Sequence, residues 1–159
     1  MIEIMSPNDY VEEIQDRRSI FLAGSIEMGK ATNWQEQLRN ELMGVKELLI
    51  LNPRREDWDS SWVQDISDSN FATQVEWELN SIDCVDMVVI YFEPGTQSPI
   101  TLMELGYVAG RCSNVIVCCP EGFWRRGNVQ IMCERFGIPL LNTKEEFIAA
   151  IKSELKVLS

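Results

Sequence analysis

Five short apolar runs, separated by segments with helical spacing, constrain the fold of this chain more than any other feature. The runs lack the polar alternation of half-exposed strands, which is typical of parallel strands covered on both faces. Helical patterns lie between and after them. Right-handed connections then predict a single α/β domain, flavodoxin-like or Rossmann-like, with a parallel sheet of about five strands in the order 2-1-3-4-5. The expected strands are 19–23, 47–51, 86–92, 114–118 and 138–141.

The ends of the chain and its length complete the domain prediction. At 159 residues the chain fits one domain, which we expect to span 19–159. Residues 1–18 are expected to be an N-terminal extension packed on it, with a weak helical pattern over 1–16 that covers an edge. No apolar run could span a bilayer and no leader is apparent, so we expect a cytoplasmic protein without a membrane partner.

Charge and residue types narrow the chemistry. The formal net charge of −11 argues against a nucleic-acid partner, because phosphate neutralisation needs clustered Lys and Arg. Local basic pairs at Arg125-Arg126 and Arg54-Arg55 remain available for a small anion. The chain has no histidine and no Cys-x-x-Cys pair, so we expect neither a metal site nor a cofactor. Acid–base chemistry must use carboxylates, Tyr, Lys or Cys.

One acid stands out on an apolar helix. Ser98 and Pro99 suit the N-cap and first position of a helix that begins at the carboxyl end of the third expected strand. Ligands bind at such ends in open α/β sheets. Glu104 is the only charged residue between Glu93 and Arg111. An isolated acid in apolar surroundings is a candidate for chemistry because its charge is costly there.

A second acid is expected to enter the same crevice. Glu78 falls on the apolar stripe of the helix expected at 71–82, whereas Glu76 faces away. Two carboxylates in different environments can serve glycosyl transfer, where one attacks the anomeric carbon and the other manages a proton. A solvated helix face is the ordinary explanation of either acid, and a second carboxylate that enters the same crevice favours a functional role for Glu78. The pair alone leaves both interpretations open.

Loop residues offer further candidates with two interpretations each. Gly24 and Ser25 follow the first strand, as a tight turn or as a loop that approaches a ligand. The segments 54–70 and 121–128 are polar and rich in aromatic residues. Such aromatic side chains either stack on planar ligands or pack the loops onto the domain. They are Trp58, Trp62, Phe123 and Trp124.

Several blocks together resemble the nucleoside 2-deoxyribosyltransferase superfamily. The strand and loop at 20–26, the segment 75–86, and Ser98 to Gly106 with its Glu-Leu-Gly motif are similar to the first loop, the helix-to-strand segment and the nucleophile helix of that family. A deoxyribosyltransferase-like subfamily also shares segments at 52–55, 58–62 and 118–128. The likeness covers about 19–117.

The resemblance implies a retaining N-glycosyl transfer without a cofactor. Glu104 would attack C1′ of a 2′-deoxynucleoside or deoxynucleotide and form a glycosyl ester, which a second base or water resolves. Glu78 would protonate the leaving base. The resemblance also implies a small-molecule nucleoside or nucleotide partner and a homo-oligomer, a dimer or higher. The candidate substrate-binding residues are Gly24, Ser25, Ser98, Asn52, Trp58, Trp124 and Arg125.

Two positions keep alternatives open. Nucleoside-type members carry Asp where this chain has Ser98, and the related 5′-monophosphate hydrolases carry Ser, so Ser98 implies either a 5′-phosphate contact or only a helix cap. Phe21 stands where many members carry Tyr, which removes a hydroxyl near the nucleophile. A catalytically weak module that binds a nucleotide-derived ligand therefore remains the alternative function.

Overall fold

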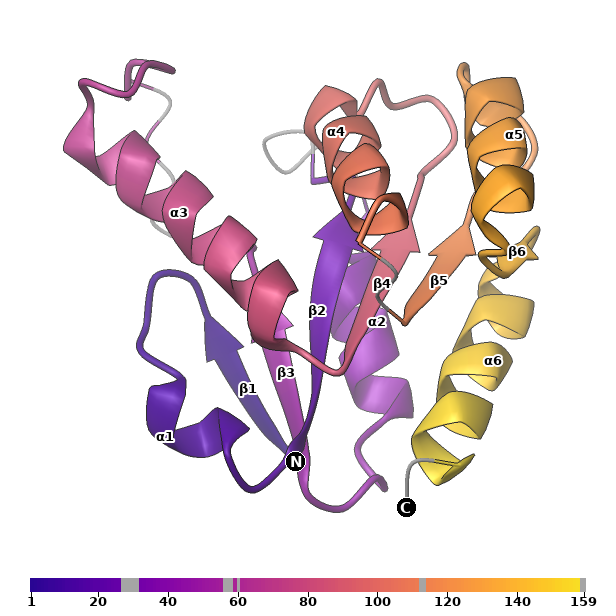
Figure 1. The fold of residues 1–159 in the computed structure, drawn as a ribbon, viewed down its shortest axis with the longest axis horizontal. Helices are drawn as coiled ribbons and strands as arrows, with labels where there is room; N and C mark the ends of the chain where they lie inside the picture. The colour runs from indigo at the N-terminus through magenta and orange to yellow at the C-terminus, as the bar shows by residue number, and fades with distance from the viewer. Residues whose placement is uncertain (27–31, 56–58, 60, 112–113, 158–159) are drawn as a thin grey trace.

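The computed structural model describes residues 1–26, 32–55, 59, 61–111 and 114–157, and its centre is a parallel sheet (Figure 1). Six strands pair in the order β1-β3-β2-β4-β5-β6, and every pairing is parallel. The five predicted strands lie in the predicted order, so the fold prediction is confirmed. The strands are β1 (Ile2–Met5), β2 (Arg18–Gly24), β3 (Leu48–Asn52), β4 (Met87–Tyr91), β5 (Val115–Cys118) and β6 (Leu140–Leu141).

The sixth strand, β1, is the difference from the prediction. Residues 1–16 were expected to be weakly helical, but Ile2–Met5 pairs with β3, with Ile2 opposite Leu49. The only helix there is the four-residue α1 (Val11–Ile14). β1 is a short, half-buried edge strand, and four residues give too little period-2 signal to distinguish it from a helix.

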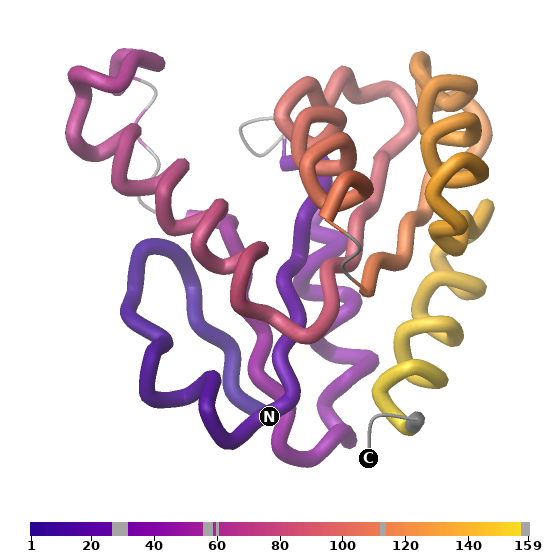
Figure 2. The backbone as a smooth tube through the Cα atoms, viewed as in Figure 1, coloured from indigo at the N-terminus to yellow at the C-terminus, as the bar shows by residue number. Residues whose placement is uncertain are grey.

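Helices cover both faces of the sheet (Figure 2). Side chains of α1, α3, α4 and α5 pack on one face, and those of α2 and α6 pack on the other. Successive residues of β2 serve the two cores in turn, since Phe21 enters the first and Leu22 the second. Both faces of each central strand are therefore apolar. The remaining helices are α2 (Trp34–Glu41), α3 (Ser69–Cys84), α4 (Pro99–Ala109), α5 (Arg126–Phe136) and α6 (Lys144–Val157).

Asn33 is the N-cap of α2, and its side-chain oxygen accepts a hydrogen bond from Glu36 N at 3.2 Å. Thr32, just before it, donates through its backbone N–H and hydroxyl to the carboxylate of Glu93, which follows β4. The loop after β2 is thereby joined to the loop after β4.

Among the described residues, no helix is long and apolar enough to cross a membrane.

Candidate functional site

The candidate site lies where β2 and β4 end. These strands pair up to Gly24 opposite Tyr91, so the segments that follow them emerge side by side. α3 and α4, on the same face of the sheet, carry Glu78 and Glu104 (Figure 1). The site thus collects residues from two loops and two helices at the edge where open α/β sheets bind ligands.

Glu104 is buried, with 8% of its surface exposed, on a helix whose neighbouring residues Leu105 and Val108 enter the core. Burial raises the pKa of its carboxyl well above the ordinary value, and the nearby charge of Glu78 raises it further. The two carboxyls therefore interact electrostatically, and the interaction disfavours the state in which both are ionised.

Glu78 is half-buried on α3, and Glu76 is exposed, as the helical pattern predicts. Burial raises the pKa of Glu78, and a hydrogen bond from the side chain of Gln74 lowers it. That bond joins Gln74 Nε2 to Glu78 Oε1 at 2.7 Å. The two side chains are one turn apart and therefore lie on the same face of α3.

Three hydroxyls meet at the start of α4. Ser25 Oγ lies 2.5 Å from Ser98 Oγ and 3.0 Å from Thr96 Oγ1, and the latter two are 2.8 Å apart. Glu93 N donates to Ser25 Oγ at 3.0 Å. Ser98 occupies the N-cap position with a left-handed φ of 44°, and its side chain makes no capping bond. The expected capping role of its hydroxyl is wrong, because the hydroxyl is turned toward Ser25 and Thr96.

Gly24 has a structural reason to be glycine. Its φ is +151°, and a Cβ there would lie 2.5 Å from the carbonyl oxygen of Tyr91 and 2.7 Å from the ring of Trp34. Only a residue without a side chain permits this approach. Trp34 also donates from Nε1 to the carbonyl of Ser25 at 3.1 Å, so the close packing fixes the loop that presents Ser25.

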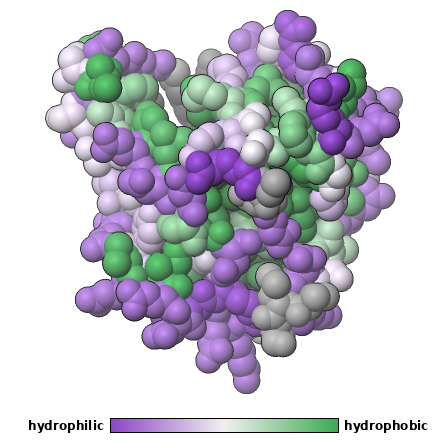
Figure 3. Space-filling model, in the orientation of Figure 1, coloured by the Kyte–Doolittle hydropathy of each residue, from purple (hydrophilic) through white to green (hydrophobic). Residues whose placement is uncertain are grey.

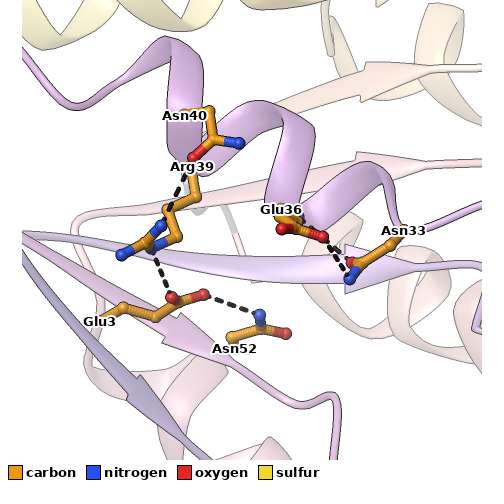
Figure 4. A network of polar contacts seen from close by, with 6 residues as sticks. All are labelled: Glu3, Asn33, Glu36, Arg39, Asn40 and Asn52. Atoms are coloured by element: carbon orange, nitrogen blue, oxygen red, sulfur yellow. Dashed lines mark hydrogen bonds and ion pairs between the residues drawn. The ribbon is translucent and has the colours of Figure 1, made fainter.

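Asn52 is buried, and its amide takes part in a polar network toward α2 (Figure 4). Nδ2 donates to Glu3 Oε1 at 2.9 Å, and Glu3 pairs with Arg39 of α2 at 2.8 Å. Oδ1 accepts a hydrogen bond from Arg54 N at 3.0 Å. The structure therefore ties Asn52 to β1 and α2, whereas Glu78 and Glu104 come from helices on the opposite face.

The aromatic loop residues divide between surface and core. Trp58 lies outside the described residues. Trp124 is 54% exposed and donates from Nε1 to the carbonyl of Gln97, next to Ser98, at 3.0 Å. The guanidinium of Arg125 lies 4.2 Å from the centre of the Trp124 ring. Phe123 is buried and packs against Phe92, with ring centres 4.8 Å apart, so the packing interpretation holds for it.

The two residues of the predicted basic pair, Arg54 and Arg55, have different environments. The Arg55 guanidinium donates to Gln74 Oε1 at 3.4 Å and lies 4.7 Å from the centre of the Trp62 ring. Burial lowers the pKa of Arg54, and the nearby charges of Glu36 and Glu93 oppose this effect. Gln74 and Thr96 are residues of the candidate site that the sequence analysis did not name. The one available signal was the four-residue spacing of Gln74 from Glu78.

In the described part of the chain, no three Cys, Asp or Glu side chains come together as a metal site would require.

Comparison with known protein families assigns the chain to one family of α/β proteins. A family model described as "Nucleoside 2-deoxyribosyltransferase like" matches residues 17–123, more than half of the chain. The protein belongs to this family. The matched region contains Glu78, Glu104 and the three hydroxyls, but neither β1 nor Trp124 and Arg125.

A structure solved as a conserved protein from Enterococcus faecalis V583 has the same fold. The superposition has a TM-score of 0.61 at 13% sequence identity and covers 87% of this chain and 99% of that one. At this identity the likeness concerns the fold alone. No curated protein matches the sequence.

Proposed function

We propose that this protein cleaves the N-glycosidic bond of a 2′-deoxynucleoside or deoxynucleotide and passes the sugar to a second base or to water. The observation that carries the proposal is the pair of half-buried Glu78 and buried Glu104, which interact electrostatically from α3 and α4 on one face of the sheet. Membership of a deoxyribosyltransferase-like family supports the choice of substrate class.

In the proposed reaction, a carboxylate oxygen of Glu104 attacks C1′, and the bond from C1′ to the base nitrogen breaks. The base leaves with the bonding electrons and receives the proton of Glu78. The acceptor, a base nitrogen or a water oxygen, then attacks C1′ from the opposite side and gives its proton to Glu78. The ester to Glu104 breaks, and two inversions retain the configuration at C1′.

The reactive form of the pair has Glu104 ionised and Glu78 protonated. Burial raises the pKa of both carboxyls, and the hydrogen bond from Gln74 lowers that of Glu78. The raised pKa values favour a pair that carries one proton at the pH of the reaction. The expected dependence of kcat/KM on pH is therefore a bell whose two limbs belong to the pair.

For the 5′ end of the sugar, we propose a phosphate contact at Ser98, with Ser25 beside it and the exposed Arg125 on the neighbouring loop. The hydroxyl cluster lies at the N-terminus of α4, where backbone N–H groups and the helix dipole favour an anion. Trp124, held against Gln97, is the proposed aromatic contact. Gly24 and Asn52 are accounted for by their packing and polar contacts.

The phosphate contact has its own test. A deoxynucleoside 5′-monophosphate should show a kcat/KM about tenfold above that of its nucleoside, and Ser98→Asp should reverse the order because the new charge repels the phosphate. Ser98→Ala is the control that removes the hydroxyl without adding a charge. Equal rates for both substrates, unchanged by Ser98→Asp, contradict the contact.

The activity itself is tested by incubating the protein with a panel of deoxynucleosides and their 5′-monophosphates and measuring the free base by chromatography. Base release that depends on Glu104 supports the proposal. Ligand binding without base release, seen by calorimetry with the same panel, would instead favour the alternative of a nucleotide-binding module.

We also propose that the protein acts in the cytoplasm as a homo-oligomer. Apolar side chains lie among polar ones on the face that carries α3, α4 and α5 (Figure 3). Ile100 and Met103 of α4 are exposed there, next to the helix position of Glu104. Analytical ultracentrifugation decides the oligomeric state, and a single monomeric species at all concentrations contradicts the proposal.

A further inference from the structure

Gln74 lies at a junction that neither the family match nor the proposed reaction explains. It is buried, with 3% of its surface exposed, and all four hydrogen-bonding positions of its amide are occupied. Nε2 donates to the carbonyl of Pro53 at 3.0 Å and to Glu78 Oε1 at 2.7 Å. Oε1 accepts from Ser6 Oγ at 2.6 Å and from Arg55 Nη1 at 3.4 Å.

These partners permit one orientation of the amide. The carbonyl of Pro53 can only accept a hydrogen bond, and the guanidinium of Arg55 can only donate one. A reversed amide would set its oxygen against the Pro53 carbonyl and its NH₂ against the Arg55 guanidinium. The network therefore decides which end of the amide faces Glu78, independently of how the two ends are told apart.

Ser6 ties this amide to the edge of the sheet. It follows β1, and its backbone N–H donates to the carbonyl of Asn52 at 3.0 Å, which joins the ends of β1 and β3. Its hydroxyl makes the shortest of the four bonds to Gln74. Ser6 lies outside the family match at 17–123, so this support comes from the N-terminal segment.

We propose that Gln74 is the positioning residue for Glu78, and that Ser6 locks the Gln74 amide in the orientation that presents its NH₂ group to the carboxyl. The catalytic meaning of this assignment rests on the proposed function. Gln74 holds Oε1 of Glu78 and leaves Oε2 as the oxygen that exchanges a proton with the leaving base.

The assignment predicts a direction for pH effects. Among the described residues, Glu104 from α4 interacts electrostatically with Glu78, and the guanidinium of Arg55, from the segment after β3, contacts Gln74. The N–H of Gln74 stabilises the ionised form of Glu78. Its removal raises the proton affinity of Glu78. At least one limb of the bell then moves to higher pH, and neither limb moves to lower pH.

The test compares Gln74→Met with Gln35→Met. Both remove a buried amide and keep the length of the side chain, but the amide of Gln35 on α2 has no hydrogen-bond partner within the described part of the chain. For Gln74→Met we expect a limb of the kcat/KM profile for base release to shift by about 1 pH unit. We also expect kcat to fall about tenfold while KM changes little, because only the oriented proton donor is lost. Gln35→Met should leave both unchanged.

A second readout does not need activity. Carbon-13 NMR of the Glu78 carboxyl in the unliganded protein should show its titration at higher pH in Gln74→Met. If the wild type releases no base, the proposed function fails while this titration still tests the contact. An unshifted Glu78 titration, or an active Gln74→Met variant with the pH profile of Gln35→Met, overturns the inference.

Two milder variants cover the case in which Gln74→Met does not fold. Gln74→Asn keeps an amide but is one methylene too short to hold both Pro53 and Glu78, so we expect a shift in the same direction. Ser6→Ala removes one lock while Pro53 and Arg55 remain, so we expect a smaller shift in that direction. Unchanged Glu78 titration in both variants overturns the assignment.

Discussion

The two faces of the sheet treat a buried glutamine in opposite ways. On the face of α3 and α4, Gln74 uses all four positions of its amide and holds Glu78. On the face of α2 and α6, Gln35 is fully buried, and neither end of its amide has a hydrogen-bond partner among the residues that the structure describes. Burying an unpartnered amide costs free energy. On the first face, the buried amide is fully paired, and one of its partners is the carboxyl of Glu78 in the candidate site.

The largest effect is expected from Glu104→Gln. Loss of the nucleophile should reduce base release by at least about 1,000-fold, as chromatography of the products can measure. The melting temperature should stay equal or rise, because a buried ionisable group is replaced by a neutral one of the same size. A variant that keeps full activity shows that the first face is not the catalytic one.

Gly24→Ala tests the close packing of Trp34, from α2 on the second face, against Gly24 in the loop that presents Ser25. The added Cβ would clash with the Tyr91 carbonyl and the Trp34 ring, so we expect a loss of about 3 kcal/mol in the free energy of unfolding. The control is Gly95→Ala, which has a φ of +82° but no atom within 4 Å of the added Cβ. Urea unfolding of the two variants separates the clash from backbone strain, and equal losses contradict the steric account.

The acid pair should also make stability depend on pH. The pKa values of Glu78 and Glu104 are raised in the folded protein, so the folded state binds more protons than the unfolded chain above the ordinary carboxyl pKa. Stability should therefore fall as pH rises from about 4.5, by about 1.4 kcal/mol for each unit of pKa shift. Urea unfolding from pH 4.5 to 8 should show a shallower fall in Glu104→Gln than in the wild type. Parallel curves of stability against pH for the two proteins would show that burial does not raise the pKa of the Glu104 carboxyl.

The smallest effect is expected on the second face. Gln35→Leu removes an unpartnered buried amide and should stabilise the protein by about 1 kcal/mol without changing base release. Gln74→Leu, which breaks four bonds, should destabilise it. Thermal unfolding of both variants measures the contrast between the faces. If Gln35→Leu destabilises the protein, the proposed contrast between the two faces is contradicted.

Much of the fold could be predicted from the sequence, and the predictions that failed depended on contacts between residues remote in the chain. The apolar strands and the Ser98-Pro99 start of α4 are strong signals because they depend on residues close in the chain. β1 was missed because it is four residues long and stabilised by pairing with β3, which is remote in sequence. The predicted capping role of the Ser98 hydroxyl was wrong because this hydroxyl contacts Ser25 and Thr96 instead. No local pattern indicates the contact with Ser25, which is 73 residues away in the sequence.

The candidate site residues likewise could be predicted where the signal was local and could not where it depended on remote residues. Glu104 could be found because it is an isolated charge on an apolar helix, and Glu78 because it lies on an apolar stripe. The positioning role proposed for Gln74 could not be predicted, because it depends on hydrogen bonds with Ser6, Pro53 and Arg55. These residues lie in the segments after β1 and β3.

The central claim is that Glu104 carries the sugar during the reaction, and mass spectrometry of the acid-quenched protein tests it most directly. After brief incubation with a deoxynucleotide that yields free base, we predict a 2-deoxyribosyl adduct on the peptide that contains Glu104 and no adduct in Glu104→Gln. Base release at an equal rate in Glu104→Gln, with no adduct on that peptide in either protein, would contradict the account.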